Sequence, residues 1–202
     1  LTVPMCRFIA MNSNVKLPFK RYAIGEVFRD GPVEKARYRS FTQCDVDVVG
    51  IKGMTADAEI IALAQRAFKK LGFDAVVKVN NRKLLNDLLI NAGVKQEQLE
   101  TAILSVDKLG KFGLETVKKE LKDKKIETTI IDNITKIINI KGNNNEKINK
   151  IEKIINNSDG LNEIDELLSL LNILKINVEL DVSLARGLAY YTGTVIEVYL
   201  KN

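Results

Sequence analysis

Residues 28–47 read Phe-Arg-Asp-Gly-Pro-Val-Glu-Lys-Ala-Arg-Tyr-Arg-Ser-Phe-Thr-Gln-Cys-Asp-Val-Asp, and this stretch decides the fold. The segments on either side of its middle, 21–29 and 38–50, have the alternation and apolar content that are typical of strands. Between them, Gly31 and Pro32 cannot continue either strand, because proline has no N–H to give to a sheet. We therefore predict two antiparallel strands joined by a loop, with Arg29 at the end of the first.

Polar side chains follow one another along the second of these strands. Because successive side chains of a strand point to opposite faces, Gln43, Asp45 and Asp47 are expected to share one face. A row of polar groups among valines is typical of the floor of a pocket.

The next part of the chain alternates helix and strand. We expect a helix from Thr55, as N-cap, to about Leu71, where Gly72 stops it. A short apolar strand follows at 75–79, and Asn80 or Asn81 then opens a helix that ends before Gly93. The order strand, strand, helix, strand, helix indicates a sheet covered by helices.

From Val94 the pattern is mostly helical, and strand character returns at 178–182 and 194–200. Breaks are expected at Gly110, Gly113, Gly142 and Asp159-Gly160, and residues 143–145 are expected to form a loop tip. The predicted fold class is α+β: an antiparallel sheet with flanking helices, present in part, and a mostly helical inserted subdomain. The predicted domains are a core of residues 1–93 and 177–202 and an insertion of residues 94–176.

The composition is that of a globular protein, with 46% hydrophobic and 28% charged residues. No apolar run is long enough for a membrane helix, and the first residues lack the core of a signal peptide. The chain contains no His, and Cys6 and Cys44 have no metal-ligand spacing, so we predict no metal site. Both cysteines are interpreted as reduced core thiols of a cytosolic protein.

Both ends of the sequence are abrupt. The first residues, Leu1 to Pro4, have the pattern of an extended segment, and the chain stops at the end of a predicted strand. These features predict a fragment.

A second informative stretch lies near the end of the chain, where residues 184–193 read Leu-Ala-Arg-Gly-Leu-Ala-Tyr-Tyr-Thr-Gly. It resembles the peptide that marks histidyl-tRNA synthetases, and residues 28–47 resemble motif 2 of class II aminoacyl-tRNA synthetases in its histidyl form. The Gly31-Pro32 loop is similar to archaeal-like members. Gly31, Ala36, Ser40 and Ala189 depart from the usual Glu, Gly, Glu and Asp, and the last two put local hydrogen bonds in doubt.

The resemblance implies a histidine–tRNA ligase, which activates histidine with ATP to histidyl-adenylate and transfers it to tRNA(His). The histidine carboxylate attacks the α-phosphorus and is already ionised, so the site needs positioning and positive charge and no general base. By resemblance, Arg29 and Arg186 are the catalytic arginines, on two sides of the α-phosphate. Arginine suits this role because its planar fork binds two oxygens and stays charged.

The resemblance also implies the substrate contacts. Asp47, Tyr190 and Tyr191 would bind the imidazole, while Thr2 and Gln43 would hold the α-ammonium. The loop residues Lys35, Arg37 and Arg39 would lie over ATP and the acceptor end of the tRNA.

The implied substrates are histidine, tRNA(His) and ATP with Mg²⁺, with no prosthetic group. The complete enzyme would be a cytoplasmic homodimer without a membrane partner. Motif 1 would precede Leu1 and motif 3 would follow Asn202, so the 202-residue chain is expected to be inactive alone.

Two other functions compete with this one. A histidine-sensing regulatory subunit of ATP phosphoribosyltransferase shares the fold, but such proteins do not keep the Arg186 peptide intact. A pure RNA-binding module leaves Arg29, Asp47 and Arg186 unexplained. In the helical block, Lys118, Lys122 and Lys125 have the spacing of one helix face, with Leu114, Val117 and Leu121 on the packed side. That face is either a phosphate-binding surface for the acceptor stem or an ordinary solvated surface.

Overall fold

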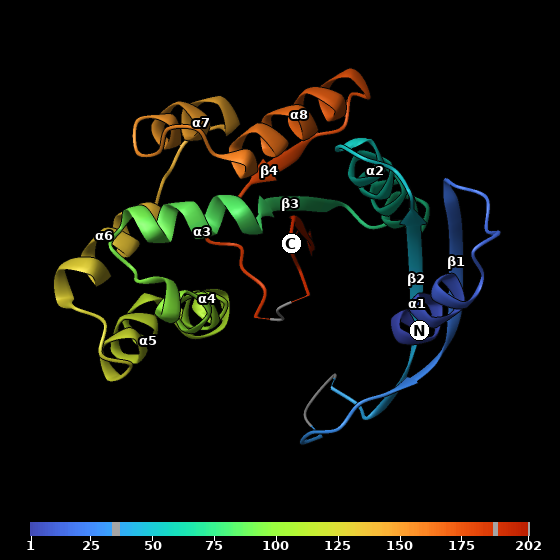
Figure 1. Ribbon diagram of the computed structural model, residues 1–202, viewed down its shortest axis with the longest axis horizontal. Coiled ribbons are helices and arrows are strands. Elements are labelled where there is room, and N and C mark those ends of the chain that lie inside the picture. Colours follow the sequence, from blue (N-terminus) through green and yellow to red (C-terminus); the bar gives the residue numbers. More distant parts are fainter. Residues whose placement is uncertain (34–36, 188–189, 202) are drawn as a thin grey trace. The chain divides into compact units, whose positions relative to one another are not determined.

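The computed structural model of the protein describes residues 1–33, 37–187 and 190–201. It divides into two units, Leu1–Ala56 and Asp57–Asn202. The first unit contains helix α1 (Thr2–Met11), strands β1 (Phe19–Phe28) and β2 (Ser40–Val49), and the start of helix α2 (Thr55–Lys70) (Figure 1).

Strands β1 and β2 form a two-stranded antiparallel ribbon. Phe19 lies opposite Val49 at one end and Phe28 opposite Ser40 at the other. Just beyond the strands, the Arg29 N–H donates to the Arg39 carbonyl at 2.8 Å, so the pairing continues into the base of the loop. The two predicted strands are confirmed, with ends shifted by one or two residues.

The expectation that residues 1–4 are extended is wrong, because helix α1 begins at Thr2. Pro4 lies in its first turn, where an N–H has no partner inside the helix, so its missing donor costs nothing. The helix contacts the ribbon: Arg21 donates to the Leu1 carbonyl at 3.3 Å, and the rings of Phe8 and Phe19 lie 5.9 Å apart.

The interpretation of Cys6 and Cys44 as core thiols is also wrong, since both are free and exposed. Cys44 lies between Gln43 and Asp45 in the strand, so its side chain points to the opposite face. Gln43 and Asp45 are on the half-buried face, and the Cys44 thiol is therefore on the exposed face. None of the residues that the structure describes in this first unit is fully buried.

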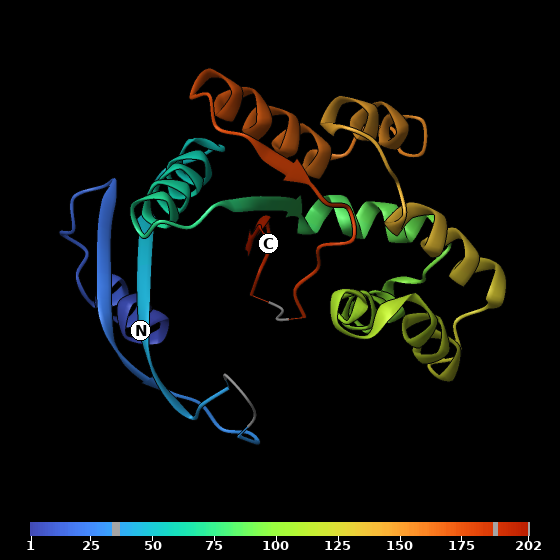
Figure 2. The ribbon, with the colours of Figure 1, turned by 180° about the vertical axis from the view of Figure 1, so that it is seen from behind.

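The second unit contains the remaining strands and most of the helices. In chain order they are β3 (Ala75–Asn81), α3 (Arg82–Asn91), a 3₁₀ turn (Gln96–Gln98), α4 (Leu99–Val106), α5 (Leu109–Asp123), α6 (Thr128–Ile138), α7 (Asn144–Glu152), α8 (Asp159–Ile173), β4 (Val178–Leu180) and β5 (Thr194–Leu200). The strand order is β4-β3-β5, with β4 parallel and β5 antiparallel to β3. Figure 2 shows β4 leaving α8 and lying along β3.

The α+β class is therefore confirmed, although in the described part of the chain the strands form two small sheets and not one. The helical block stands in the connection between β3 and β4, where a parallel pair needs a long crossover. That residues 94–176 form a separate domain stays a prediction.

Several helix boundaries follow the predicted signals. Helix α2 begins at Thr55, and Gly72 after it has the left-handed φ of 82° that favours glycine. Asn81 caps α3 by accepting from the Lys83 N–H at 2.8 Å. Gly113 kinks α5 with φ 78°.

The predicted breaks at Gly110 and Asp159-Gly160 are wrong. Gly110 lies inside α5, and residues 159–160 form the first turn of α8, which the Ser158 hydroxyl caps. Gly160 is where helix α8 comes close to α3: a Cβ there would lie 2.1 Å from the Leu84 nitrogen. Glycine is needed for this close approach and does not end the helix.

Residues 143–145 are not a loop tip. Asn143 and Glu146 form a capping box at the start of α7, in which each side chain bonds the backbone N–H of the other. Asn144 and Asn145 are already helical. A polar triplet is common in loops, but here one asparagine is the cap that lets the other two continue as helix.

Helix α7 is fastened to β4 through side chains that bond its backbone. Asn144 donates to the Val178 carbonyl and accepts from the Leu180 N–H, both at 2.9 Å. Lys147, whose side chain is 8% exposed, donates to the Leu180 carbonyl at 2.6 Å. These bonds satisfy the outer edge of β4, which would otherwise present unpaired backbone groups.

The hydrophobic core of this unit lies among the helices and against the sheet. It includes Leu84, Leu85, Leu88, Leu89, Ile103, Val117, Leu121, Ile134, Ile151, Ile164 and Leu180. In the part of the chain that the structure describes, no helix combines the length and hydrophobicity needed to cross a membrane.

We predict that Lys147→Met lowers the free energy of unfolding by about 1–3 kcal/mol, because the buried Leu180 carbonyl loses its donor. The matched control is Lys150→Met, since Lys150 lies on the same helix and donates to the exposed Lys141 carbonyl. The control should change stability by no more than about 0.5 kcal/mol. Chemical denaturation of both variants measures the difference, and equal losses would contradict the role given to Lys147.

Candidate functional site

One face of the β1–β2 ribbon carries the predicted polar row. Gln43 lies opposite Gly25, Asp45 opposite Ala23 and Asp47 opposite Arg21. A Cβ built on Gly25 would meet nothing within 4 Å, so the space above it in this unit is open. The prediction that residues 43, 45 and 47 share a face is confirmed, and the small Gly25 and Ala23 opposite Gln43 and Asp45 leave room for a ligand.

The polar side chains of this row are already oriented by one another. The Gln43 amide nitrogen donates to Asp45, which leaves the amide oxygen free to accept. Arg21 donates to Asp47 Oδ2 at 2.7 Å and also to the Leu1 carbonyl. Arg21 therefore ties the row to the start of α1, where the exposed Thr2 lies.

Arg29 lies at the other end of the same face. Its guanidinium carbon is 4.5 Å from the centre of the Phe41 ring. Phe41 is two residues before Gln43 in β2, so the two side chains share one face of the ribbon. Its Nε donates to the Tyr38 carbonyl at 2.9 Å, so the head group is held over the ribbon.

The loop residues are placed less uniformly. Arg39 is anchored, with its Nε donating to the Gly31 carbonyl at 2.9 Å, whereas Arg37 is exposed at the loop base. Lys35 and the departure at Ala36 lie outside the described residues.

In the second unit, Arg186 lies with both predicted tyrosines. Its Nη1 donates to Glu197 Oε1 at 2.6 Å, and its guanidinium carbon is 5.8 Å from the centre of the Tyr191 ring. The rings of Tyr190 and Tyr191 lie 4.6 Å apart. The structure thus groups Arg186, Tyr190 and Tyr191 in one unit, and Thr2, Arg29, Gln43 and Asp47 in the other. The departure at Ala189 lies in a part that is not described.

The backbone around Arg186 is held by Asn80 at the end of β3 and by Arg82 at the start of α3, and the sequence analysis identifies neither role. The buried Asn80 amide donates to the carbonyls of Val182 at 3.1 Å and Leu184 at 2.8 Å. Arg82 donates through Nη1 to the Arg186 carbonyl at 2.7 Å and through its backbone N–H to the Gly193 carbonyl at 2.8 Å. Two adjacent asparagines at the end of an apolar strand are the available signal, although by themselves they predict only a helix cap.

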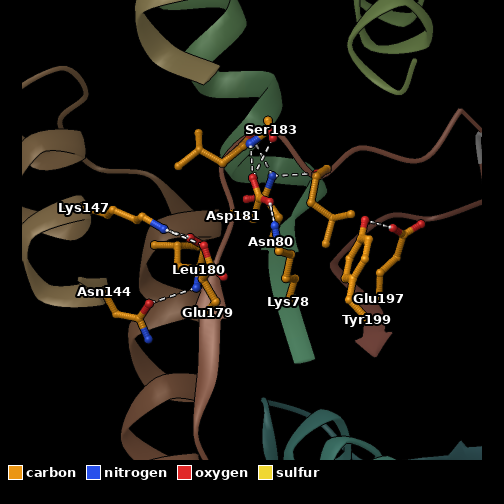
Figure 3. A network of polar contacts seen from close by, with 12 residues as sticks. Lys78, Asn80, Asn144, Lys147, Glu179, Leu180, Asp181, Ser183, Glu197 and Tyr199 are labelled. Atoms are coloured by element: carbon orange, nitrogen blue, oxygen red, sulfur yellow. Dashed lines mark hydrogen bonds and ion pairs between the residues drawn. The ribbon is translucent and has the colours of Figure 1, made fainter. Parts of the chain in front are cut away.

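A second polar group beside Arg186 consists of Lys78, Asp181 and Tyr199 (Figure 3). Lys78 donates to Asp181 at 2.8 Å and lies 5.1 Å from the centre of the Tyr199 ring. Burial raises the pKa of Asp181, but hydrogen bonds from Lys78 and Ser183 outweigh it and lower the pKa overall. The hydrogen bond to Asp181 in turn raises the pKa of Lys78, so the pair stays ionised near neutral pH.

These residues line a cleft of about 920 Å³ in the second unit. Arg186, Glu197 and Asp181 lie on the sheet side, and Lys111 and Lys141 come from the helical block. Acidic and basic groups mix along its wall, so the cleft offers paired charges to a polar ligand. Within residues 1–33, 37–187 and 190–201, no three metal-binding side chains come together.

The lysines of the helical block are arranged only partly as expected. Val117 and Leu121 are buried on the packed side. However, Lys118 pairs with Glu115 at 3.3 Å, and Lys125 lies beyond the end of α5 with a left-handed φ of 61°. The expectation of three lysines on one helix face is therefore wrong, because the helix ends at Asp123.

Comparison with known proteins decides the family. The family model for histidyl-tRNA synthetase matches residues 1–202. The chain belongs to the histidyl-tRNA synthetase family.

Relatives of this synthetase-family chain agree with that result. The chain is 41% identical over its full length to a protein named histidine–tRNA ligase 1 from Bacillus cereus, of which it covers 47%. It is 38% identical to a histidine–tRNA ligase from Azobacteroides pseudotrichonymphae, covering 45% of that protein. The chain thus spans about half the length of these relatives. Both relatives are bacterial, and the archaeal-like character of the Gly31-Pro32 loop stays a prediction.

Solved structures show the same fold. The crystal structure of histidyl-tRNA synthetase from Nostoc sp. PCC 7120 matches with a TM-score of 0.87 and 30% identity, over 98% of this chain and 48% of that one. This confirms the predicted class II synthetase-like architecture. A Bacillus halodurans structure titled as an ATP phosphoribosyltransferase regulatory subunit/histidyl-tRNA synthetase matches with a TM-score of 0.80 at 21% identity, which shows shared fold alone.

The contact between Glu197 and Tyr199 predicts an unusual titration. The Tyr199 hydroxyl donates to Glu197 Oε2 at 2.6 Å, and this hydrogen bond raises the pKa of Tyr199 from 10.0 to about 12. Because the folded pKa is raised, the stabilisation is present below pH 10 and is lost as pH rises toward 12.

We expect ¹³C-tyrosine NMR to show the Tyr199 signal, assigned by its loss in Tyr199→Phe, titrating well above the ordinary range. In Glu197→Gln its pKa should fall back toward 10, because the charged acceptor is gone. A normal titration of Tyr199 in the unmodified protein would show that the hydrogen bond does not form in solution.

Proposed function

We propose that this chain forms the part of a histidine–tRNA ligase that activates histidine with ATP and passes it to tRNA(His). The observation that carries the proposal is the state of Arg186, which lies in the peptide typical of the family. Its Nη1 and its backbone carbonyl are held in place, while its Nε and Nη2 have no hydrogen-bonding partner among the described residues. A charged fork with two free nitrogens suits a phosphate.

In the first step, the histidine carboxylate attacks the α-phosphorus of ATP and pyrophosphate leaves. The nucleophile needs no base, so the chain contributes positioning and charge. Arg29 and Arg186 stabilise the negative charge that develops on the α-phosphate oxygens. Mg²⁺ enters with ATP as part of that substrate.

Histidine would be recognised on the ribbon. Arg21 holds one oxygen of Asp47, and the other, Oδ1, has no partner in the described part of the chain, so it can accept the imidazole N–H. Tyr190 and Tyr191 are the further ring contacts that the family resemblance implies. Because Asp45 occupies the amide nitrogen of Gln43, the amide oxygen can accept from the α-ammonium, together with the Thr2 hydroxyl.

In the second step, a terminal ribose hydroxyl of tRNA(His) attacks the adenylate carbonyl and AMP leaves. The loop that carries Lys35, Arg37 and Arg39 supplies positive charge for ATP and the acceptor end. The proposed setting is a cytoplasmic homodimer, as in the complete enzyme that the family implies.

The competing function is a histidine-sensing regulatory subunit, which would bind histidine without using ATP. Its support is limited to shared fold at 21% identity. Histidine-dependent ATP–pyrophosphate exchange by the full-length gene product separates the two, because a regulatory subunit gives none. Measured histidine binding without any exchange would favour the regulatory function.

We predict that Arg186→Ala in the full-length gene product lowers the exchange rate constant by about 10²–10³, as expected for one preorganised donor. The KM for histidine should change little, and Arg186→Lys should restore little because a point charge cannot replace the fork. Arg66→Ala, on the exposed side of α2, is the control. Normal turnover with weakened histidine binding would move Arg186 to the substrate pocket.

We predict that Asp47→Asn raises the KM for histidine strongly while the KM for ATP stays within about twofold. The amide keeps the shape but loses the charge and one acceptor, which leaves both Arg21 and the imidazole poorly paired. Asp123→Asn, at the exposed end of α5, is the matched control. If ATP affinity fell and histidine affinity did not, Asp47 would not be the imidazole partner.

A further inference from the structure

Glu197 is the side chain that holds the head group of Arg186. It lies on β5, and its Oε1 accepts from Arg186 Nη1 at 2.6 Å. The Arg186 side chain is 40% exposed and that of Glu197 is 29% exposed, so the pair lies at the wall of the cleft. A long exposed arginine would otherwise sample many rotamers, and one anchored nitrogen restricts them.

Glu197 is itself fixed by a second contact. Its Oε2 accepts from the Tyr199 hydroxyl at 2.6 Å, so each carboxylate oxygen has its own partner. Lys78 lies over the Tyr199 ring and is bound to Asp181. The carboxylate is therefore held in a defined orientation by a chain of contacts that runs across the sheet (Figure 3).

The guanidinium has a further restraint on its other side. Tyr191 lies under it, and Arg82 holds the Arg186 backbone. Burial alone would lower the pKa of Arg186, but the hydrogen bond and charge of Glu197 outweigh it and raise the pKa. The contact to Glu197 therefore stabilises the charged form of the Arg186 guanidinium.

We propose that Glu197 is a positioning residue for adenylation: it binds Nη1 of Arg186 and so presents the other two nitrogens of the guanidinium to the α-phosphate. This inference rests on the proposed function. Glu197 does not touch substrate in this scheme, because its two oxygens are already occupied. Its loss should therefore affect the rate of the chemical step and not the binding of histidine.

The sheet offers a matched control for Glu197. Lys78 lies on the central strand, with Glu197 opposite it on β5 and Glu179 opposite it on β4. Glu179 is thus the counterpart of Glu197 in the same row of the sheet, but it contacts Lys147 and not Arg186. Glu179→Gln changes the charge of the cleft by the same amount without changing the anchor of Arg186.

The experiment measures histidine-dependent ATP–pyrophosphate exchange in the full-length gene product. Glu197→Gln is expected to lower kcat by about 10- to 100-fold, the usual loss when a residue that orients an active group is removed. The KM of Glu197→Gln for histidine should stay within about twofold of the unmodified protein's value. The kcat of Glu179→Gln should also stay within about twofold of the unmodified protein's value. Tyr199→Phe should lower kcat in the same direction by a smaller factor.

The double variant Arg186→Ala/Glu197→Gln tests whether Glu197 acts through Arg186. If it does, the double variant has the same kcat as Arg186→Ala alone, because the two losses are not additive. A further fall in the double variant would overturn the inference, as would an unchanged kcat in Glu197→Gln. A raised KM for histidine with normal kcat would make Glu197 a substrate ligand and also overturn it.

Failure of the inference can be told from failure of the proposed function. If Arg186→Ala keeps full exchange activity, the role of Arg186 is wrong and the inference falls with it. If Arg186→Ala loses activity and Glu197→Gln does not, only the role of Glu197 is wrong. Thermal unfolding shows whether each variant is folded. If Glu197→Gln is unstable, Tyr199→Phe serves as the test instead, because Tyr199 is 44% exposed. An unchanged kcat in Tyr199→Phe then overturns the inference.

Discussion

The arrangement of the second unit depends on the hydrogen bonds at the end of strand β3. Residues 182–187 pass beside the sheet without belonging to a strand, so their carbonyls have no regular backbone donors. Asn80 supplies two donors from one buried amide, and Arg82 supplies two more to the segments before and after the tyrosines. A buried polar side chain is costly unless it is bonded, and here its bonds give an irregular segment one conformation. The carbonyls of Val182, Leu184 and Arg186 are thereby tied to side chains next to the sheet.

The next layer of organisation is electrostatic. Two charged groups near Arg186 are bound by a group of opposite charge or by a hydroxyl: Lys78 by Asp181, and Glu197 by both Arg186 and Tyr199. At half-exposed positions a single ion pair contributes little to stability. Its value here is geometric, since consecutive contacts between strands restrict the rotamers of every member. For the proposed role of Arg186 at a phosphate, such restriction matters more than added charge.

The sequence predicted the features that depend on local pattern. Alternation in β2 placed Gln43, Asp45 and Asp47 on one face, and the capping role of Asn81 could be identified from its position before a helix. Where two local signals compete, pattern alone was insufficient: Leu1 to Pro4 is helical, and Asn143 begins a helix that was expected to be a loop. The contacts of Asn80, Arg82 and Glu197 could not be predicted, because their partners lie far away in the chain and are backbone atoms or side chains of ordinary type.

The hydrogen bonds from side chains of α7 to the backbone of β4 have a consequence for how the sequence can vary. Asn144 bonds the main-chain atoms of Val178 and Leu180, and Lys147 bonds the main-chain oxygen of Leu180. Main-chain atoms are the same whatever side chain a residue carries. The strand can therefore exchange one apolar residue for another over evolutionary time without loosening its hold on the helix, whereas Asn144 and Lys147 have no comparable freedom. The constraint from these bonds falls on the helix, and on the strand only packing limits the choice of side chain, as it does at the buried Leu180.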